Sequence, residues 1–169
     1  MNTGHGDAKK ELEGILSAIG QLKQNEVAAM DFYHDAGKRA KDPMVEKLLY
    51  FLADMEKEHH KMLDETEDRL KNGKTVSAMS FTQNVTPFDL RIDMPDLTGR
   101  ESLMKTLEEA SALEMKSQYG FEHAAEKTNM KELREFFLSM AGEERRHFLL
   151  LKDVAWSLGN FGMWANPRA

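Results

Sequence analysis

The segment LADMEKEHHKML, residues 52–63, decides the fold, because it places two ionisable side chains on an apolar helical stripe. Leucine occupies positions 49, 52 and 63, at the three- and four-residue spacing of one helix face. Glu56 and His59 fall on the same face, where packing would favour leucine. A buried carboxylate is strongly unfavourable unless it is neutralised or binds a metal, so this helix face is predicted to carry a polar site.

A second segment, MAGEERRHFLLL at residues 140–151, repeats the first with an offset of 88 residues. Its Glu144 and His147 correspond to the glutamate and the histidine of the first segment. In both, the Glu-x-x-His spacing puts a carboxylate and an imidazole one turn apart on the same helix face. The chain therefore contains two copies of one structural unit.

A further glutamate lies 30 residues before the glutamate of each segment: Glu26 before Glu56, and Glu114 before Glu144. Both lie on apolar stripes, and the midpoint of each 30-residue interval falls at a predicted turn. Each glutamate should therefore face its partner across a helical hairpin, roughly 22 Å from the turn and near the middle of the bundle. The side chains predicted to converge are Glu26, Glu56, His59, Glu114, Glu144 and His147.

Four inward carboxylates need a positive partner, and no lysine or arginine occupies these stripes. The chain has no cysteine, which excludes disulfides, thiolate zinc sites, iron–sulfur centres and cysteine nucleophiles. Nitrogen and oxygen ligands in this number suit two metal ions with open coordination positions. The alternative is a salt-bridged polar core without metal.

The chain is predicted to be all-α, a four-helix bundle made of two hairpins joined by a long crossover. Asp42 and Pro43 are a typical helix cap and first helical residue, and Lys71-Asn72-Gly73 is a typical left-handed helix stop. With 169 residues, one domain is expected. The predicted helices are about 7–41, 43–71, 99–128 and 130–158, the crossover is 72–98, and the tail 159–169 is predicted to be non-helical.

Composition limits the partners. The formal charge of −6 comes from interspersed acidic and basic residues, so no basic face for nucleic acid is expected. Residues 1–10 contain no apolar stretch typical of a signal peptide, and no run of about 18 apolar residues occurs. We therefore expect a soluble cytoplasmic protein that binds neither nucleic acid nor membrane.

The chain resembles the ferritin-like superfamily, and most of all the di-iron domain of rubrerythrin. The resemblance covers roughly residues 12–71 and 99–158. It rests on Glu26 followed by Tyr33, Glu114 followed by Phe121, and the two Glu-x-x-His segments. It implies a centre of two iron ions, for which manganese or zinc could substitute.

The same resemblance implies a role for each residue of the site. Glu56 and Glu144 would bridge the metals, the other four residues would be terminal ligands, and Tyr33 would hydrogen-bond to a ligand. Rubrerythrin-like proteins usually have one more glutamate three residues after the third-helix ligand, and this chain has Ser117 there. Residues Glu58, His60 and Glu143 adjoin the ligands in sequence but are expected at the surface.

Several functions are compatible with this pattern. The resemblance implies reduction of hydrogen peroxide or dioxygen, or oxidation of ferrous iron, while iron storage and a dimanganese catalase-like activity are alternatives. The rubredoxin-like module of the family needs cysteines, so an external electron donor such as a rubredoxin-type protein is expected. A homodimer is expected as well, and the long crossover would permit exchange of hairpins between chains.

Overall fold

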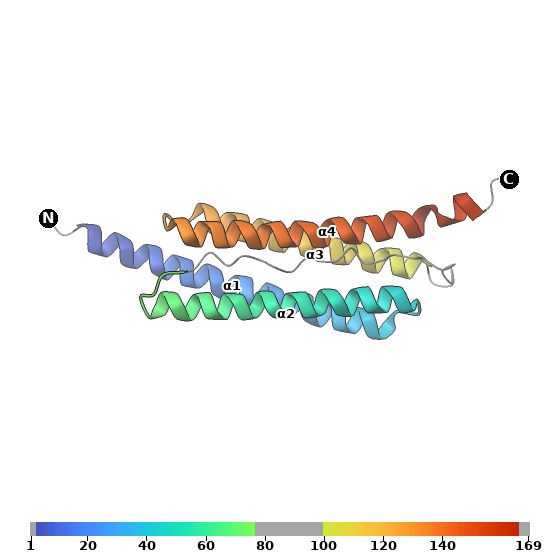
Figure 1. Cartoon of the computed structure of the whole chain (residues 1–169), viewed down its shortest axis with the longest axis horizontal. Coiled ribbons are helices and arrows are strands. Elements are labelled where there is room, and N and C mark those ends of the chain that lie inside the picture. The colour runs from blue at the N-terminus through green and yellow to red at the C-terminus, as the bar shows by residue number, and fades with distance from the viewer. Residues whose placement is uncertain (1–2, 77–99, 166–169) are drawn as a thin grey trace.

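The computed structural model describes residues 3–76 and 100–165. It contains four helices, α1 (Thr3–Arg39), α2 (Pro43–Lys71), α3 (Arg100–Glu126) and α4 (Lys131–Ala165). They form two antiparallel hairpins, α1 with α2 and α3 with α4, and α2 and α3 run in the same direction (Figure 1). The predicted all-α bundle of two hairpins is confirmed. Most of the predicted crossover, residues 77–98, lies outside the described residues.

The first hairpin turn follows from two residues. The Asp42 carboxylate caps α2 by accepting hydrogen bonds from the backbone N–H groups of Met44 at 2.8 Å and Val45 at 3.1 Å. Pro43 is the first helical residue. An N–H at this position would have no acceptor within the helix, so proline loses no hydrogen bond there. The predicted cap is therefore confirmed.

The end of α2 is closed by a left-handed glycine. Gly73 has φ +63°, a conformation that residues with a Cβ rarely adopt. Its N–H donates to the Leu70 carbonyl at 3.1 Å, and the Lys74 N–H donates to the Arg69 carbonyl at 2.9 Å. This pair of bonds is the Schellman arrangement, so the predicted stop at residues 71–73 is confirmed.

The predicted end of the fourth helix at residue 158 is wrong, because α4 continues to Ala165. The tail from residue 159 is predicted to be non-helical, but a glycine such as Gly159 inside a helix costs only about 1 kcal/mol relative to alanine. Val154 and Leu158 are buried just before it and hold the preceding turns against the bundle. The helix α1 similarly begins at Thr3 rather than at residue 7.

The core consists of two apolar clusters, one toward each end of the bundle. One contains Ile19, Leu63, Phe121 and Phe137, and the other contains Leu52, Leu107 and Leu151 among its members. On every helix the predicted ligands fall between these two groups of residues. A polar layer at mid-bundle is therefore closed off above and below by hydrocarbon.

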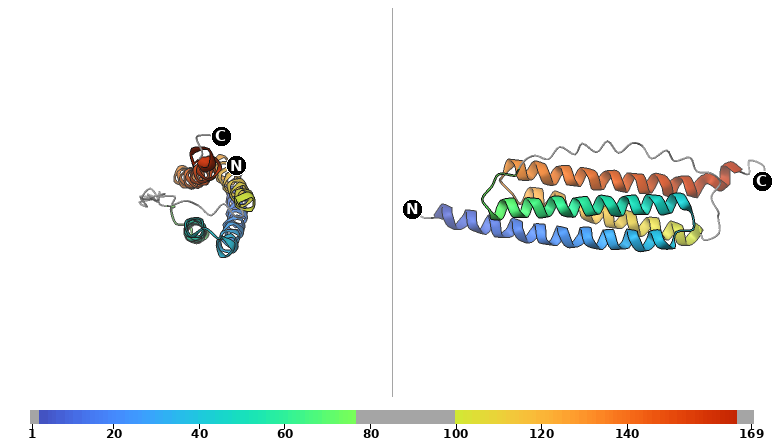
Figure 2. Two further views of the ribbon diagram at one scale, coloured as in Figure 1. Left: turned by 90° about the vertical axis from the view of Figure 1, so that its right-hand side faces the viewer. Right: turned by 60° about the horizontal axis from the view of Figure 1, so that its bottom comes forward.

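The two hairpins contact each other mainly along α1 and α3, which lie side by side in the end-on view (Figure 2). Gly120 allows this approach, since a Cβ there would lie 3.0 Å from Leu22 Cδ2 of α1. Among the described residues, α2 and α4 approach each other less closely. Within the same residues, no helix is long and apolar enough to cross a membrane.

Candidate metal centre

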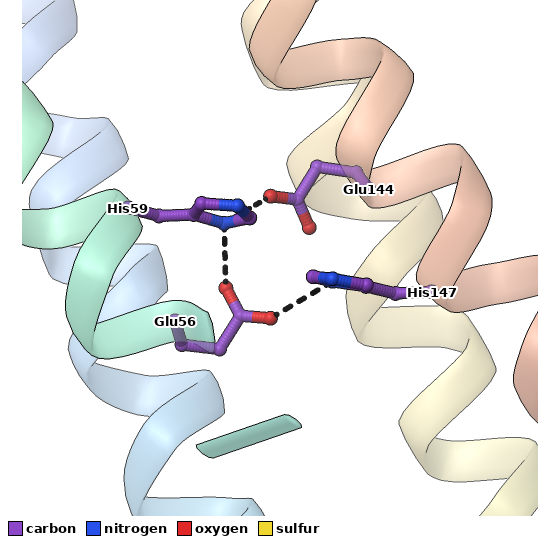
Figure 3. A group of neighbouring side chains, drawn as sticks. All are labelled: Glu56, His59, Glu144 and His147. Atoms are coloured by element: carbon purple, nitrogen blue, oxygen red, sulfur yellow. Dashed lines mark hydrogen bonds and ion pairs between the residues drawn. The ribbon is translucent and has the colours of Figure 1, made fainter. Parts of the chain in front are cut away.

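The structure brings all six predicted side chains together in the middle of the bundle, and none is more than 2% exposed. Four ligand atoms, one from each Glu and His of the two Glu-x-x-His pairs, lie within 4.8 Å of one another. These two pairs come from α2 and α4 and point toward each other across the bundle (Figure 3). Each helix places its pair on one face because the two residues are three positions apart.

The imidazole of His59 is surrounded by carboxylates from three helices. Its Nδ1 lies 3.4 Å from Glu26 Oε2 on α1 and 3.2 Å from Glu56 Oε2 on α2. It also lies 2.8 Å from Glu144 Oε1 on α4, an ion-pair distance without the alignment of a hydrogen bond. Glu26 and His59 define one half of the centre.

His147 occupies the corresponding place in the other half. Its Nδ1 lies 3.4 Å from Glu114 Oε2 on α3 and 3.3 Å from Glu56 Oε1 on α2. The rings of His59 and His147 are stacked, with centroids 5.4 Å apart. Glu56 therefore directs one carboxylate oxygen to each imidazole.

Within the described residues, two hydroxyl groups contact carboxylates of this cluster, those of Glu114 and Glu26. Tyr33, buried on α1, donates a hydrogen bond from Oη to Glu114 Oε1. Ser117, buried on α3, donates from Oγ to Glu26 Oε1 at 3.5 Å. The second contact is one that the sequence analysis missed, although position 117 lies on the same stripe as Glu114.

The donor set of the centre fits metal ions. Eight buried side-chain atoms of the six residues have no hydrogen-bond partner within the described part of the chain. Such groups are rare in folded proteins unless an ion or water satisfies them. They are Glu26 Oε2, Glu56 Oε1, His59 Nε2, Glu114 Oε2, both oxygens of Glu144, and both ring nitrogens of His147.

Burial and mutual charge shift the pKa values of the carboxyl groups apart. Burial, which outweighs the effect of the adjacent His59 imidazole, raises the pKa of Glu26 to about 8. Burial, together with the charge of Glu56, raises the pKa of Glu144 well above its usual range. Burial also acts to raise the pKa of Glu56, but the adjacent imidazoles of His147 and His59 outweigh it and lower that pKa. Without metal, burial therefore favours the neutral acid form of Glu26 and Glu144, whereas the two imidazoles favour the carboxylate form of Glu56.

The imidazoles and the phenol also retain their protons. Burial acts to lower the pKa of His59, but the adjacent carboxyl groups of Glu144, Glu26 and Glu56 together outweigh it and raise that pKa well above its usual range. For His147, the adjacent carboxylates of Glu114 and Glu56 likewise outweigh burial and raise the pKa to about 9. Burial and the charge of Glu114 raise the pKa of Tyr33 well above its usual range. Protons thus supply the positive charge that metal ions would otherwise bring.

One expectation about the neighbours of the ligands is wrong. Glu143 is buried at 2% exposure and accepts hydrogen bonds from Arg146, whereas a surface position was expected. It lies one turn before His147, so the two side chains share a side of α4. Glu58 is exposed as expected, and the half-buried His60 pairs with Asp64 at 3.2 Å.

Comparison with models of known protein families gives a match. The family model described as Rubrerythrin matches residues 23–155, a range that contains all six predicted ligands. No curated protein and no solved structure matches the chain significantly.

Proposed function

Since the chain belongs to the rubrerythrin family, we propose that it is a non-haem di-iron oxidoreductase that reduces hydrogen peroxide or dioxygen. The observation that carries this proposal is the buried set of four carboxylates and two imidazoles with unpaired atoms facing one another. Such a set matches the preference of divalent iron for nitrogen and oxygen ligands. The ligands we propose are Glu26, Glu56, His59, Glu114, Glu144 and His147.

Two ferrous ions held by these residues would supply two electrons and Lewis acidity, which suits the two-electron, two-proton reduction of hydrogen peroxide to two waters. Within the site, Glu56 is placed to bridge, because its two oxygens face different imidazoles. Tyr33 orients Glu114 through its hydrogen bond and keeps a proton inside the apolar bundle. The two hydrocarbon clusters exclude bulk water from either side of the site.

Repeated turnover needs electrons from outside the chain. An iron–sulfur or rubredoxin-type centre needs cysteine ligands and these 169 residues contain none, so we propose a separate rubredoxin-type donor. We place the protein in the cytoplasm as a homodimer, with exchange of hairpins as an alternative assembly. Size-exclusion chromatography with light scattering measures the assembly directly.

Oxidation of ferrous iron as a substrate, with storage of the product, is the second candidate. Ser117 favours it, because a neutral hydroxyl replaces the additional glutamate that the family usually has at this position. With six rather than seven ligand groups, one metal position has fewer anchors and can release its ion more readily.

The first experiment measures metal content and redox reactivity. Untagged protein is analysed by mass spectrometry, then loaded anaerobically with ferrous iron and mixed with peroxide or oxygen while near-ultraviolet absorbance is followed. About two irons per chain that oxidise rapidly would support the proposal. Glu56→Ala should abolish this oxidation, and Glu58→Ala, an exposed carboxylate two residues away, should leave it unchanged.

Other outcomes redirect or reject the proposal. Two manganese ions per chain would indicate catalase-like chemistry, and ferric iron accumulating far beyond two ions per chain in a very large particle would indicate storage. If reloading gives no stoichiometric metal, or Glu56→Ala oxidises like the unmodified protein, the di-iron proposal is wrong.

A further inference from the structure

The two halves of the centre are related by the internal repeat, but their supporting residues differ. The offset of 88 residues pairs Tyr33 with Phe121 and Ser117 with Ala29. All four residues are buried, so each half has one hydroxyl group, at a different position. The two halves of the repeat therefore have the same proposed ligands but differ in the hydroxyl groups that hydrogen-bond to those ligands.

These hydroxyls are unequal hydrogen-bond donors. Tyr33 donates directly to Glu114, whereas Ser117 reaches Glu26 only at 3.5 Å, the outer limit of a hydrogen bond. Phe121 has no hydroxyl with which to give Glu26 the bond that Tyr33 gives Glu114. The carboxylate of Glu114 is thus held firmly, and that of Glu26 is held weakly.

Support of this kind affects metal affinity. A hydrogen bond to a ligating carboxylate fixes its orientation, and removal of such a partner typically lowers metal affinity about 10–100-fold. Both carboxylates are buried, so the protein's own donors determine how they are oriented. A difference in donors should therefore become a difference in binding.

We propose that the two metal positions have unequal affinity, with tight binding at Glu114 and His147 and weaker, more exchangeable binding at Glu26 and His59. Tyr33 and Ser117 are the positioning residues that create the difference. This inference rests on the dinuclear centre proposed above. It identifies the half of the centre from which a metal ion would be released or replaced first.

The test is an anaerobic titration of metal-free protein with Co²⁺, followed by calorimetry and by visible absorption. The unmodified protein should bind two ions in two steps whose affinities differ at least about tenfold. Removal of one imidazole assigns the steps. His59→Ala should remove the weaker step, and His147→Ala should remove the tighter one.

Three substitutions test the positioning residues. Tyr33→Phe should weaken the tighter step about tenfold and narrow the gap between the steps. Ser117→Ala should weaken only the second step, by about threefold, because the bond removed is long. Phe121→Tyr places a phenol at the repeat-related position and should tighten the second step.

Ser111→Ala is the matched control. Ser111 is buried on the same helix, but its hydroxyl donates to the Leu107 carbonyl at 2.8 Å and does not contact the centre. It should leave both binding steps unchanged. Thermal unfolding of each metal-free variant identifies any variant that fails to fold, and Tyr33→Phe and Ser117→Ala decide the matter if Phe121→Tyr is one of them.

The outcomes separate this inference from the proposed function. Binding of fewer than two Co²⁺ ions by the unmodified protein would reject the dinuclear centre itself. Two ions bound in a single step, or equal weakening of both steps by Tyr33→Phe, would reject the inequality while leaving the centre intact.

Discussion

Glu26 and His147 hold protons at neutral pH in the metal-free protein, because burial raises the pKa of the first and neighbouring carboxylates raise that of the second. A group whose pKa is raised by folding stabilises the fold fully below its unfolded pKa. That contribution decreases as the pH rises and is gone above the folded pKa. The folded values are about 8 for Glu26 and about 9 for His147, against unfolded values near 4.3 and 6.5.

The melting temperature of the metal-free protein should therefore fall by roughly 5–10 °C between pH 6 and pH 9.5. Differential scanning calorimetry over this range measures the change. Glu26→Gln should flatten the slope, since the amide cannot lose the proton in question. Metal-loaded protein should also show a shallower slope, because bound ions replace the protons. A metal-free protein with a constant melting temperature over this range would contradict the assignment of protonation states.

At this scale the sequence predicted which residues meet but not how they contact one another. Position 56 could be predicted because a charged residue interrupted a regular leucine stripe. The bond from Ser117 to Glu26 could not, because it depends on the relative rotation of α1 and α3. The burial of Glu143 was missed because helical angle alone does not specify which neighbouring element covers a side chain.

Among the elements, glycine shows how local chemistry determines where a helix ends. Gly73 ends α2 in a left-handed conformation, whereas Gly142 lies within α4 and has nothing within 4 Å of an added Cβ. Gly73→Ala should lower the free energy of unfolding by about 1 kcal/mol, because alanine is strained at positive φ. Gly142→Ala should raise it by about 0.5–1 kcal/mol, because alanine has the higher helix propensity.

Chemical denaturation of both variants measures these opposite effects. Each change adds the same single methyl group, so each variant is a control for the other. Equal signs for the two substitutions would contradict the conformational explanation. The same comparison explains why α4 continues through Gly159. Gly73 ends α2 because its backbone is left-handed, and the presence of a glycine in the sequence does not by itself specify that conformation.

In the whole molecule, the hairpins are joined unevenly. Helices α1 and α3 pack closely, while α2 and α4, within the described residues, approach each other less closely and face each other across the centre. Metal ions bound there would connect α2 to α4 directly. Removal of metal should therefore increase backbone hydrogen exchange around residues 52–63 and 140–151 by about tenfold or more, and increase it less along α1 and α3.

Hydrogen exchange followed by mass spectrometry tests this in metal-loaded and metal-free protein. Metal-free His59→Ala, compared with metal-free unmodified protein, is the control that separates loss of the ion from loss of the ligand. Uniform deprotection of all four helices would show that the metal stabilises the bundle globally rather than at the α2–α4 side.

The polar layer between the two apolar clusters also fixes the alignment of the helices. If α2, for example, slid by a single turn, about 5.4 Å, its carboxylate would move toward one of the apolar clusters and Leu52 or Leu63 would enter the charged layer. Burial of an unpaired charge in this way is strongly unfavourable. The stripes of leucine, alanine and phenylalanine could tolerate such a slide, because their spacing repeats along each helix. The same six side chains that we propose bind metal therefore also fix the axial register of the helices, because other registers with similar apolar packing would bury a charge in hydrocarbon.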